Sequence, residues 1–246
     1  MFLERREALH EIFRFFGKWV NRYDIDGTSN NGEADLLHDW GITKLNSIYP
    51  LQNKSVIEMA PQEAAHSIMS HNFGAKKIVG LEGRLENYVK CCVIKNIFEL
   101  DNCKFYLEDL RTVDLKKFGS FDVCICSGIL YHLPQPQRLI AQIAEISPRI
   151  LINTHCANDV FPKGLIKSSE VELKGRRYRG KTLDEVNTDH PSAGLQPVSF
   201  WFFKDDLIAL LADLGYTDVQ FLKDWMPESP GLTVYAQKST ASEHNV

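Results

Sequence analysis

Between residues 54 and 155, short apolar runs alternate with segments of helical pattern, and this alternation limits the possible folds more than any other feature of the sequence. Apolar runs of strand length cover residues 54–60, 77–83, 102–109, 120–128 and 148–155. Helical patterns cover residues 62–73, 84–100 and 136–147. Strands that are buried on both faces read as continuous apolar runs, as these do. The alternation therefore predicts an α/β fold, with a parallel sheet and helices on both of its faces.

The pattern changes on both sides of this region. After His155 the alternation stops, and residues 156–200 have a mixed pattern. Further helices are expected over 3–23, 33–48 and 204–216, and two further strands, able to pair antiparallel, over 218–225 and 232–238. Residues 239–246 are expected to form a disordered tail.

Composition excludes several classes of protein. The chain has 246 residues and 44% hydrophobic content, enough for a core of two or three layers. A formal net charge of −4 does not predict the broad basic face of a nucleic-acid-binding protein. None of the cysteines has CxxC spacing, so no metal site is predicted. The N-terminus is charged, and no apolar run reaches the roughly 18 residues of a membrane span, so we expect a soluble cytoplasmic protein with reduced thiols.

Ligands of an open α/β sheet bind beyond the carboxyl ends of its strands, so the residues that follow each strand are the candidates for a site. Glu58 and the turn Ala60-Pro61-Gln62 follow the first strand, and no glycine lies between Glu58 and Gly74. Pro61 also removes a backbone donor. A diphosphate cradle needs several such donors, so neither NAD nor FAD is predicted.

Polar residues also follow the next strands. Glu82 has the position of a carboxylate that accepts hydrogen bonds from ribose hydroxyls, although a solvated helix-cap acid is the alternative. In Glu108-Asp109, a carboxylate could accept from an adenine amino group or cap the next short helix. Ser127-Gly128 ends the most apolar strand, and Gly128 would let a ligand lie against the backbone.

The acids at these strand ends and the segment SGILYHL, residues 127–133, resemble class I S-adenosylmethionine-dependent methyltransferases. The resemblance covers about residues 50–155, and the ending 203–238 is also typical. GILYHL is most similar to the group that contains the tRNA wobble-uridine carboxymethyltransferases and many small bacterial methyltransferases. Where related sequences read ELGPxEGG, this chain reads EMAPQEAA, with alanine at positions 60, 64 and 65.

The resemblance implies a Rossmann-like doubly wound sheet of seven strands, of which the last is antiparallel, and S-adenosyl-L-methionine as the cofactor. Glu82 would hold the ribose, Asp109 and the Leu110 backbone would read the adenine, and Ser127 with the Ala60 loop would hold the methionine end. The expected cofactor-binding residues are Glu58, Ala60, Gln62, Glu82, Gly83, Asp109, Leu110, Ser127 and Gly128. Alanine does not adopt positive φ cheaply, so we expect lower cofactor affinity if Ala60 has positive φ.

The resemblance also divides the chain. The parts are an N-terminal helical extension (1–50), a cofactor-binding half (51–155), an insertion or substrate lid (156–202), a C-terminal helix and strand pair (203–238) and the tail.

Methyl transfer requires alignment of the acceptor and, for a hydroxyl or protonated amine, a base. His132 and His155 close neighbouring strands and are both candidates, either as the base or as structural hydrogen-bond partners. Tyr131 could orient the acceptor. The acceptor pocket is expected to be built from the N-terminal helix and the 156–200 insertion.

Two features of the insertion bear on the acceptor. KGRRYRGK, Lys174 to Lys181, is either a solvated charged hairpin or a clamp for a carboxylate, a phosphate or an RNA backbone. Trp201 and Phe203 either wall the pocket or pack in the core.

Three functions remain open. The first is methylation of a small-molecule hydroxyl or amine, with an acceptor that carries an anionic group as one option. The second is methylation or carboxymethylation of RNA, against which the net charge weighs. The third is a non-catalytic methyltransferase-like subunit, which the missing glycines favour.

Overall fold

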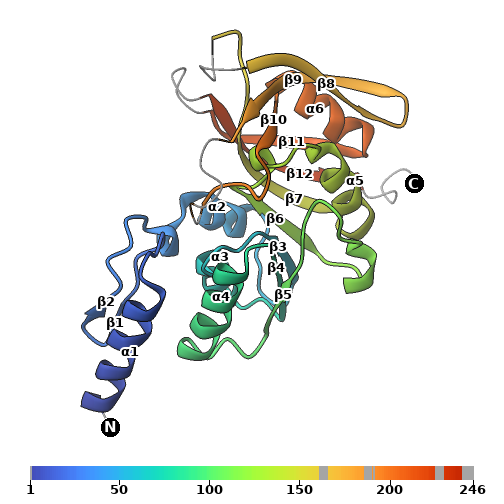
Figure 1. Cartoon of the computed structure of the whole chain (residues 1–246). Coiled ribbons are helices and arrows are strands. Elements are labelled where there is room, and N and C mark those ends of the chain that lie inside the picture. Colours follow the sequence, from blue (N-terminus) through green and yellow to red (C-terminus); the bar gives the residue numbers. More distant parts are fainter. Residues whose placement is uncertain (1, 161–165, 186–189, 191, 225–229, 240–246) are drawn as a thin grey trace, which may run out of the picture.

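A seven-stranded sheet in the order β11-β12-β7-β6-β3-β4-β5 forms the centre of the computed structural model, which describes all residues except 1, 161–165, 186–189, 191, 225–229 and 240–246 (Figure 1). Its strands are β3 (Ser55–Met59), β4 (Lys77–Glu82), β5 (Cys103–Leu107), β6 (Val123–Ser127), β7 (Arg149–His155), β11 (Tyr216–Asp224) and β12 (Gly231–Lys238). Only β12 runs antiparallel to its neighbours, β7 and β11. The predicted Rossmann-like sheet of seven strands with an antiparallel last strand is confirmed.

The order in which the chain builds the sheet determines where a ligand site forms. After β3 the chain adds β4 and β5 on one side, and then crosses over to add β6 and β7 on the other. The strand order therefore reverses between β3 and β6, and at such a point a crevice opens beyond the carboxyl ends of the strands.

Helices cover both faces of the sheet. The described helices are α1 (Phe2–Phe16), which lies beside the sheet, α2 (Trp40–Ile48), α3 (Ala65–Asn72), α4 (Leu85–Ile97), α5 (Pro136–Ile146) and α6 (Lys204–Asp213), with 3-10 turns η1 (Leu36–His38), η2 (Leu115–Phe118) and η3 (Leu130–His132). Alternate residues of β3 enter different cores. Val56 packs with Ile68 and Ile94 of α3 and α4, whereas Ile57 packs with Ile140 of α5.

The N-terminal region differs from its prediction. The helix expected over 3–23 ends at Phe16, because Gly17 has φ 64° and residues 18–23 leave the helix. The helix expected over 33–48 is split at Asp39, whose side chain accepts a hydrogen bond from Ile42 N and caps α2. Between these helices lie two short strands, β1 (Asp24–Ile25) and β2 (Thr28–Ser29).

The insertion forms a second, three-stranded sheet that the sequence pattern does not predict. It contains β8 (Ile166–Leu173), β9 (Arg176–Asp184) and β10 (Val198–Phe202) in the order β10-β9-β8, all antiparallel. Lys174 and Gly175 both have positive φ, as a two-residue hairpin turn requires. Figure 1 shows this sheet at the end of the molecule opposite α1.

Two expectations concern the ends of the chain and membranes. The expected tail lies, apart from Ser239, outside the described residues. Among the helices that the structure describes, none combines the length and the apolar character needed to cross a bilayer.

The loop between β3 and α3 has an unusual backbone. Ala60 has φ 54°, Gln62 has φ 56° and Ala64 has φ 68°, so each lies in the left-handed region without being glycine. Each such residue costs about 1–2 kcal/mol relative to the right-handed conformation. The loop is nevertheless formed, and its shape is therefore maintained by contacts with other parts of the chain.

Replacement of Ala60 by glycine should raise the free energy of unfolding by about 1 kcal/mol, because glycine adopts positive φ without a Cβ clash. Ala209, in the interior of α6, is a matched control at which glycine should lower that free energy by about 1 kcal/mol. Urea denaturation of both variants measures the two changes. A destabilising Ala60→Gly substitution would show that the loop is not strained.

Candidate functional site

A cavity of about 290 Å³ lies beyond the carboxyl ends of β3, β4 and β6. Its volume is close to the lower end of the range for ligand pockets, about 300 Å³. All of the predicted cofactor-binding residues except Glu58 line it, namely Ala60, Gln62, Gly83, Glu82, Asp109, Leu110, Ser127 and Gly128. The acids at the ends of β4 and β5 thus face one shared cleft, as the sequence pattern predicts.

Glu58 is described by the structure but does not line the cavity. It is 2% exposed, Ser67 Oγ donates to its Oε2 at 2.5 Å, and His66 Nδ1 lies 3.3 Å from its Oε1. Glu58 therefore holds the first turn of α3 against the end of β3. Direct contact between Glu58 and a ligand, which the sequence pattern suggests, has no counterpart in this arrangement.

Glu82 links the ends of two strands. Its Oε2 accepts from the backbone amide of Gln62 at 3.0 Å, and its Oε1 accepts from the backbone amide of Arg84 at 2.8 Å. Burial raises the pKa of this carboxyl to about 7, although these backbone donors lower it. Each carboxylate oxygen has a second lone pair, so Glu82 can still accept hydrogen bonds from a ligand in the cavity.

Asp109 is paired with Arg111, which also lines the cavity. Arg111 Nε lies 2.7 Å from Asp109 Oδ1 and 2.9 Å from Oδ2, and the backbone amide of Arg111 donates to Oδ1 at 2.9 Å. The hydrogen bonds from Arg111 lower the pKa of Asp109. Asp109 is thus an ionised group at the cavity wall that closes a local turn with Arg111. It does not cap the next short helix, η2, whose cap is Asp114.

The end of β6 leaves space beside the backbone. Gly128 has φ 74°, and a Cβ built there would have only the hydroxyl of Tyr131 within 4 Å, at 3.9 Å. On the neighbouring β7, the side-chain amide of Asn153 donates to Ser127 Oγ at 3.3 Å. The backbone carbonyl of Asn153 accepts from the Gly128 amide at 2.8 Å. A ligand can therefore lie directly against Gly128, beside an oriented serine hydroxyl.

His132 is the predicted histidine that lines the cavity. Its Nδ1 lies 3.0 Å from Glu185 Oε1. Burial raises the pKa of Glu185, but its polar contacts with His132, Ser199 and the Gly194 backbone together lower it overall. With Nδ1–H donating to Glu185, the Nε2 of His132 can accept a proton.

His155 has a different environment. Its ring stacks on Trp201 with centroids 4.9 Å apart and meets the edge of Tyr131 at 4.6 Å. Burial lowers its pKa and favours the neutral ring. Tyr131 lines the cavity, and burial raises its pKa to about 12. The described side chains of His155, Trp201 and Phe203 do not line the cavity, which favours packing for Trp201 and Phe203.

His66 is a cavity residue that the sequence pattern does not single out. It is 9% exposed, and its Nε2 has no hydrogen-bond partner among the described residues, with Asp39 Oδ2 at 3.9 Å. Burial lowers its pKa, but Glu58 and Asp39 raise it overall. A signal was available, since a histidine in the first helical turn after β3 has to lie near the crevice.

The insertion covers part of the cavity. Gln62 Nε2 donates to Ser192 Oγ at 2.8 Å, Arg84 donates to the carbonyl of Ala193 at 3.2 Å, and Leu195 lies against Gly83. Ser192, Ala193 and Leu195 of the insertion line the cavity, as expected for the acceptor pocket. The N-terminal wall comes from Leu36 and Asp39, and among the described residues none of the N-terminal helix, from which it was expected, lines the cavity.

The cationic stretch 174–181, which the structure describes in full, does not line the cavity. Arg176 pairs with Asp213, Arg177 with Glu170 and Arg179 with Asp206. These ion pairs favour the interpretation as a solvated charged hairpin over that as an anion clamp.

Several solved structures share this fold. The N-terminal domain of EvdMO1 with SAH bound superposes with a TM-score of 0.81 at 22% identity, over 95% of this chain and 97% of that chain. Magnesium protoporphyrin IX methyltransferase from Synechocystis PCC 6803 with bound SAM has a TM-score of 0.55 at 14% identity, over 85% of this chain and 86% of that chain.

Sequence comparisons are weaker. No protein-family model matches the chain. The tRNA U34 carboxymethyltransferase of Shewanella sediminis is 26% identical over 149 residues, and that of Shewanella oneidensis is 25% identical over 143 residues. Each match covers 57% of this chain and 42% of the relative, so the chain spans less than half the length of these curated relatives.

Both of these solved structures carry SAH or SAM. The chain has the fold of the class I S-adenosylmethionine-dependent methyltransferases.

Proposed function

We propose that this protein transfers a methyl group from S-adenosylmethionine to a hydroxyl or amine of a small molecule. The convergence of Glu82 and Asp109 on one cleft, beside the open backbone at Gly128, supports this proposal most directly. An adenosyl group with an amino acid attached suits this site, which offers two carboxylates as hydrogen-bond acceptors, an unobstructed glycine and a cavity of about 290 Å³.

Each part of the cofactor has a candidate partner. The remaining lone pairs of Glu82 would accept from the ribose hydroxyls, with Gly83 beside them. Asp109 and the backbone of Leu110 would read the adenine. The loop of Ala60 and Gln62, together with Ser127 and Gly128, would hold the methionine end.

When bound, the cofactor supplies an electrophilic methyl group, so the protein has to align the acceptor and remove its proton. His132 is the favoured base, because Glu185 orients its ring and it lines the cavity. Tyr131 would orient the acceptor. His155 would support Tyr131 through ring contact at 4.6 Å rather than take the proton itself.

The surroundings of the cavity favour a small acceptor. Insertion residues 192–195 line the cavity, and the three arginines of the charged hairpin are paired with acids outside it. The N-terminal domain of EvdMO1 was crystallised in the presence of SAH and D-fucose, a small sugar. Arg84 at the cavity wall would suit an anionic group on the acceptor. We retain the division into an extension (1–50), a cofactor half (51–155), an insertion (156–202) and a C-terminal part (203–238) as a proposal.

The names of the sequence relatives favour tRNA methylation or carboxymethylation as the second candidate. A carboxymethyl group would need a cation near the transferred carbon. Arg111 lies in the cavity, but its guanidinium is paired with Asp109, which makes it a weak candidate for that task. A non-catalytic subunit is the third candidate, since the left-handed alanines would disfavour cofactor binding.

Calorimetry with S-adenosylhomocysteine tests the proposal. The wild-type protein should bind, and Glu82→Gln should weaken binding by about 10- to 100-fold, because hydrogen bonds to a charged group contribute about 1.5–3 kcal/mol. Glu108→Gln is a matched control, because Glu108 lies at the end of the next strand, pairs with Lys117 and does not line the cavity. A folded wild-type protein that binds neither S-adenosylmethionine nor its demethylated product would leave only the non-catalytic candidate.

The pKa of Glu82, which burial raises to about 7, makes cofactor binding depend on pH. The ionised carboxylate accepts from ribose hydroxyls, and its fraction rises from about one-tenth at pH 6 to about nine-tenths at pH 8. The association constant for S-adenosylhomocysteine should therefore rise about tenfold over this interval. Glu82→Gln should remove the rise, and an equal slope in wild type and variant would assign it to another group.

Transfer of a radiolabelled methyl group separates small-molecule from RNA acceptors. Label from S-adenosylmethionine should enter the small-molecule fraction of a size-fractionated cell extract, and bulk tRNA should remain unlabelled. His132→Gln should lower the labelling rate by about 10²- to 10⁴-fold, as expected for a lost general base, without changing affinity for S-adenosylhomocysteine. Labelled tRNA would instead establish the second candidate.

A further inference from the structure

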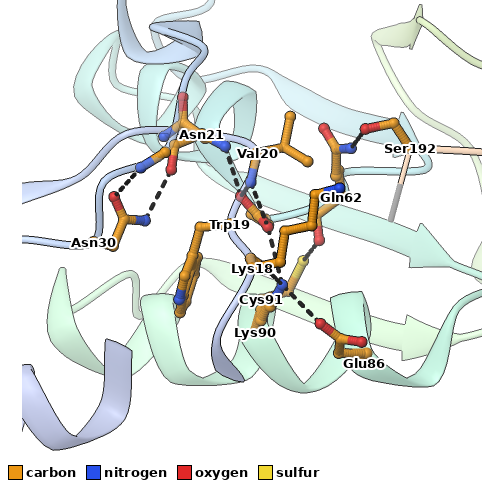
Figure 2. Close-up of polar contacts among 12 residues, drawn as sticks. Lys18, Trp19, Val20, Asn21, Asn30, Gln62, Glu86, Lys90, Cys91 and Ser192 are labelled. Carbon is orange, nitrogen blue, oxygen red and sulfur yellow. Dashed lines mark hydrogen bonds and ion pairs between the residues drawn. The ribbon is translucent and has the colours of Figure 1, made fainter. Parts of the chain in front are cut away.

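Glu63, between the left-handed residues Gln62 and Ala64, has its carboxylate buried at the base of the loop with 1% exposure. The backbone amides of Val20 and Asn21 donate to it, Val20 at 3.1 and 3.0 Å and Asn21 at 2.7 Å, as the dashed lines in Figure 2 show. Glu63 thus connects the loop to a segment that lies far from it in the sequence.

Lys90 of α4 supports the same carboxylate. Its side chain is fully buried, and its Nζ lies 3.2 Å from Glu63 Oε1 and 2.9 Å from Glu86 Oε1 (Figure 2). The ammonium also donates to the carbonyl of Lys18 and lies 5.0 Å from the centre of the Trp19 ring. One buried cation therefore joins α4, the loop and the N-terminal segment.

The segment of residues 18–23, which we call the N-terminal strap, is itself firmly placed. Trp19 is 5% exposed, packs edge-on against Phe13 and Phe16, and donates from Nε1 to the carbonyl of Phe13 at 3.2 Å. Tyr23 is fully buried, and its hydroxyl donates to the backbone carbonyl of Glu63. The strap therefore contacts both the side chain and the backbone of Glu63.

The loop needs such support because its conformation is one that glycine adopts readily and alanine does not. Gln62 is left-handed, and in this conformation its amide donates to Glu82, the proposed ribose partner. Charge-assisted hydrogen bonds of the kind made by Glu63 are roughly twice as strong as neutral ones. They are therefore suited to hold a turn against its backbone preference.

We propose that the N-terminal strap is a positioning element for the cofactor loop, and that through Glu63 it holds the alanine-containing turn in the shape required for Gln62 and Glu82 to receive the cofactor. This inference rests on the proposed function for the cofactor and extends it to residues outside the cavity. Glu63 is a positioning residue, since it does not line the cavity. The contacts of the strap stabilise the positive φ values that glycines would adopt without support.

Glycine rescue tests the inference. Glu63→Gln keeps the size of the side chain but removes its charge, and should lower the affinity for S-adenosylhomocysteine at least tenfold in calorimetry. Adding Ala60→Gly and Ala64→Gly should restore the affinity to within about threefold of wild type, because glycines need no support for positive φ. A general structural role for Glu63 would not be rescued by glycine in the loop.

Two further variants complete the set. Glu86→Gln removes the half-exposed partner of Lys90 and leaves the contacts of Glu63 intact, so its affinity should stay within twofold of wild type. Glu63→Asp keeps the charge opposite Lys90 but is one methylene too short for the amides of Val20 and Asn21. If Glu63→Gln does not fold, Glu63→Asp replaces it in the test, and it should show the same loss of affinity and the same rescue by glycine.

Hydrogen exchange separates this inference from the proposed function, because it needs no cofactor. In the free protein, peptides that cover residues 58–66 should exchange at least tenfold faster in Glu63→Gln, and the added glycines should reverse the change. Unchanged exchange, or a loss of affinity that glycines do not restore, overturns the role of the strap. Failure of the wild-type protein to bind S-adenosylhomocysteine overturns the proposed function, and the exchange result still decides whether the strap holds the loop.

Discussion

The hydrogen bond from the backbone amide of Gln62 to the carboxylate of Glu82, 3.0 Å long, joins the ends of two neighbouring strands, and the shape of the cavity depends on it. The amide reaches the carboxylate only because Gln62 has a left-handed backbone. The carboxylate in turn stays in place only because two backbone donors compensate part of its burial. Loop, strand ends and cavity wall therefore form one unit, which contacts from outside the sheet have to stabilise.

The parallel part of the sheet could be predicted because strands with two buried faces are continuous apolar runs. Their alternation with helices makes the strands parallel, so their carboxyl ends lie at one edge of the sheet. The same reasoning fails in the insertion. Strands β8 and β9 form an exposed hairpin in which cations and acids pair across and beyond the strands, so their sequence has no apolar run to read. The N-terminal helix was predicted too long because Val20 continues its apolar spacing past Gly17, where the left-handed backbone ends it.

The site could be predicted only as far as position along a strand determines it. Glu82 and Asp109 follow their strands and reach the cleft. Glu58 lies two residues earlier in the register, since it pairs with Gly80, and its side chain contacts His66 and Ser67 instead of the cleft. His66 and Arg111 enter the cavity from a helix and a loop, where the pairing partners Glu58 and Asp109 orient them. Such partners are known only once the chain is folded.

The alanines of the loop also determine whether its backbone loses conformational entropy during folding or only when a ligand binds. A glycine-rich loop samples many backbone states before a ligand arrives, so each binding event has to order it again. Ala60 and Ala64 restrict that sampling, and the buried network around Glu63 selects one state during folding. The loop is thus preorganised, and its backbone does not have to become ordered when a ligand binds.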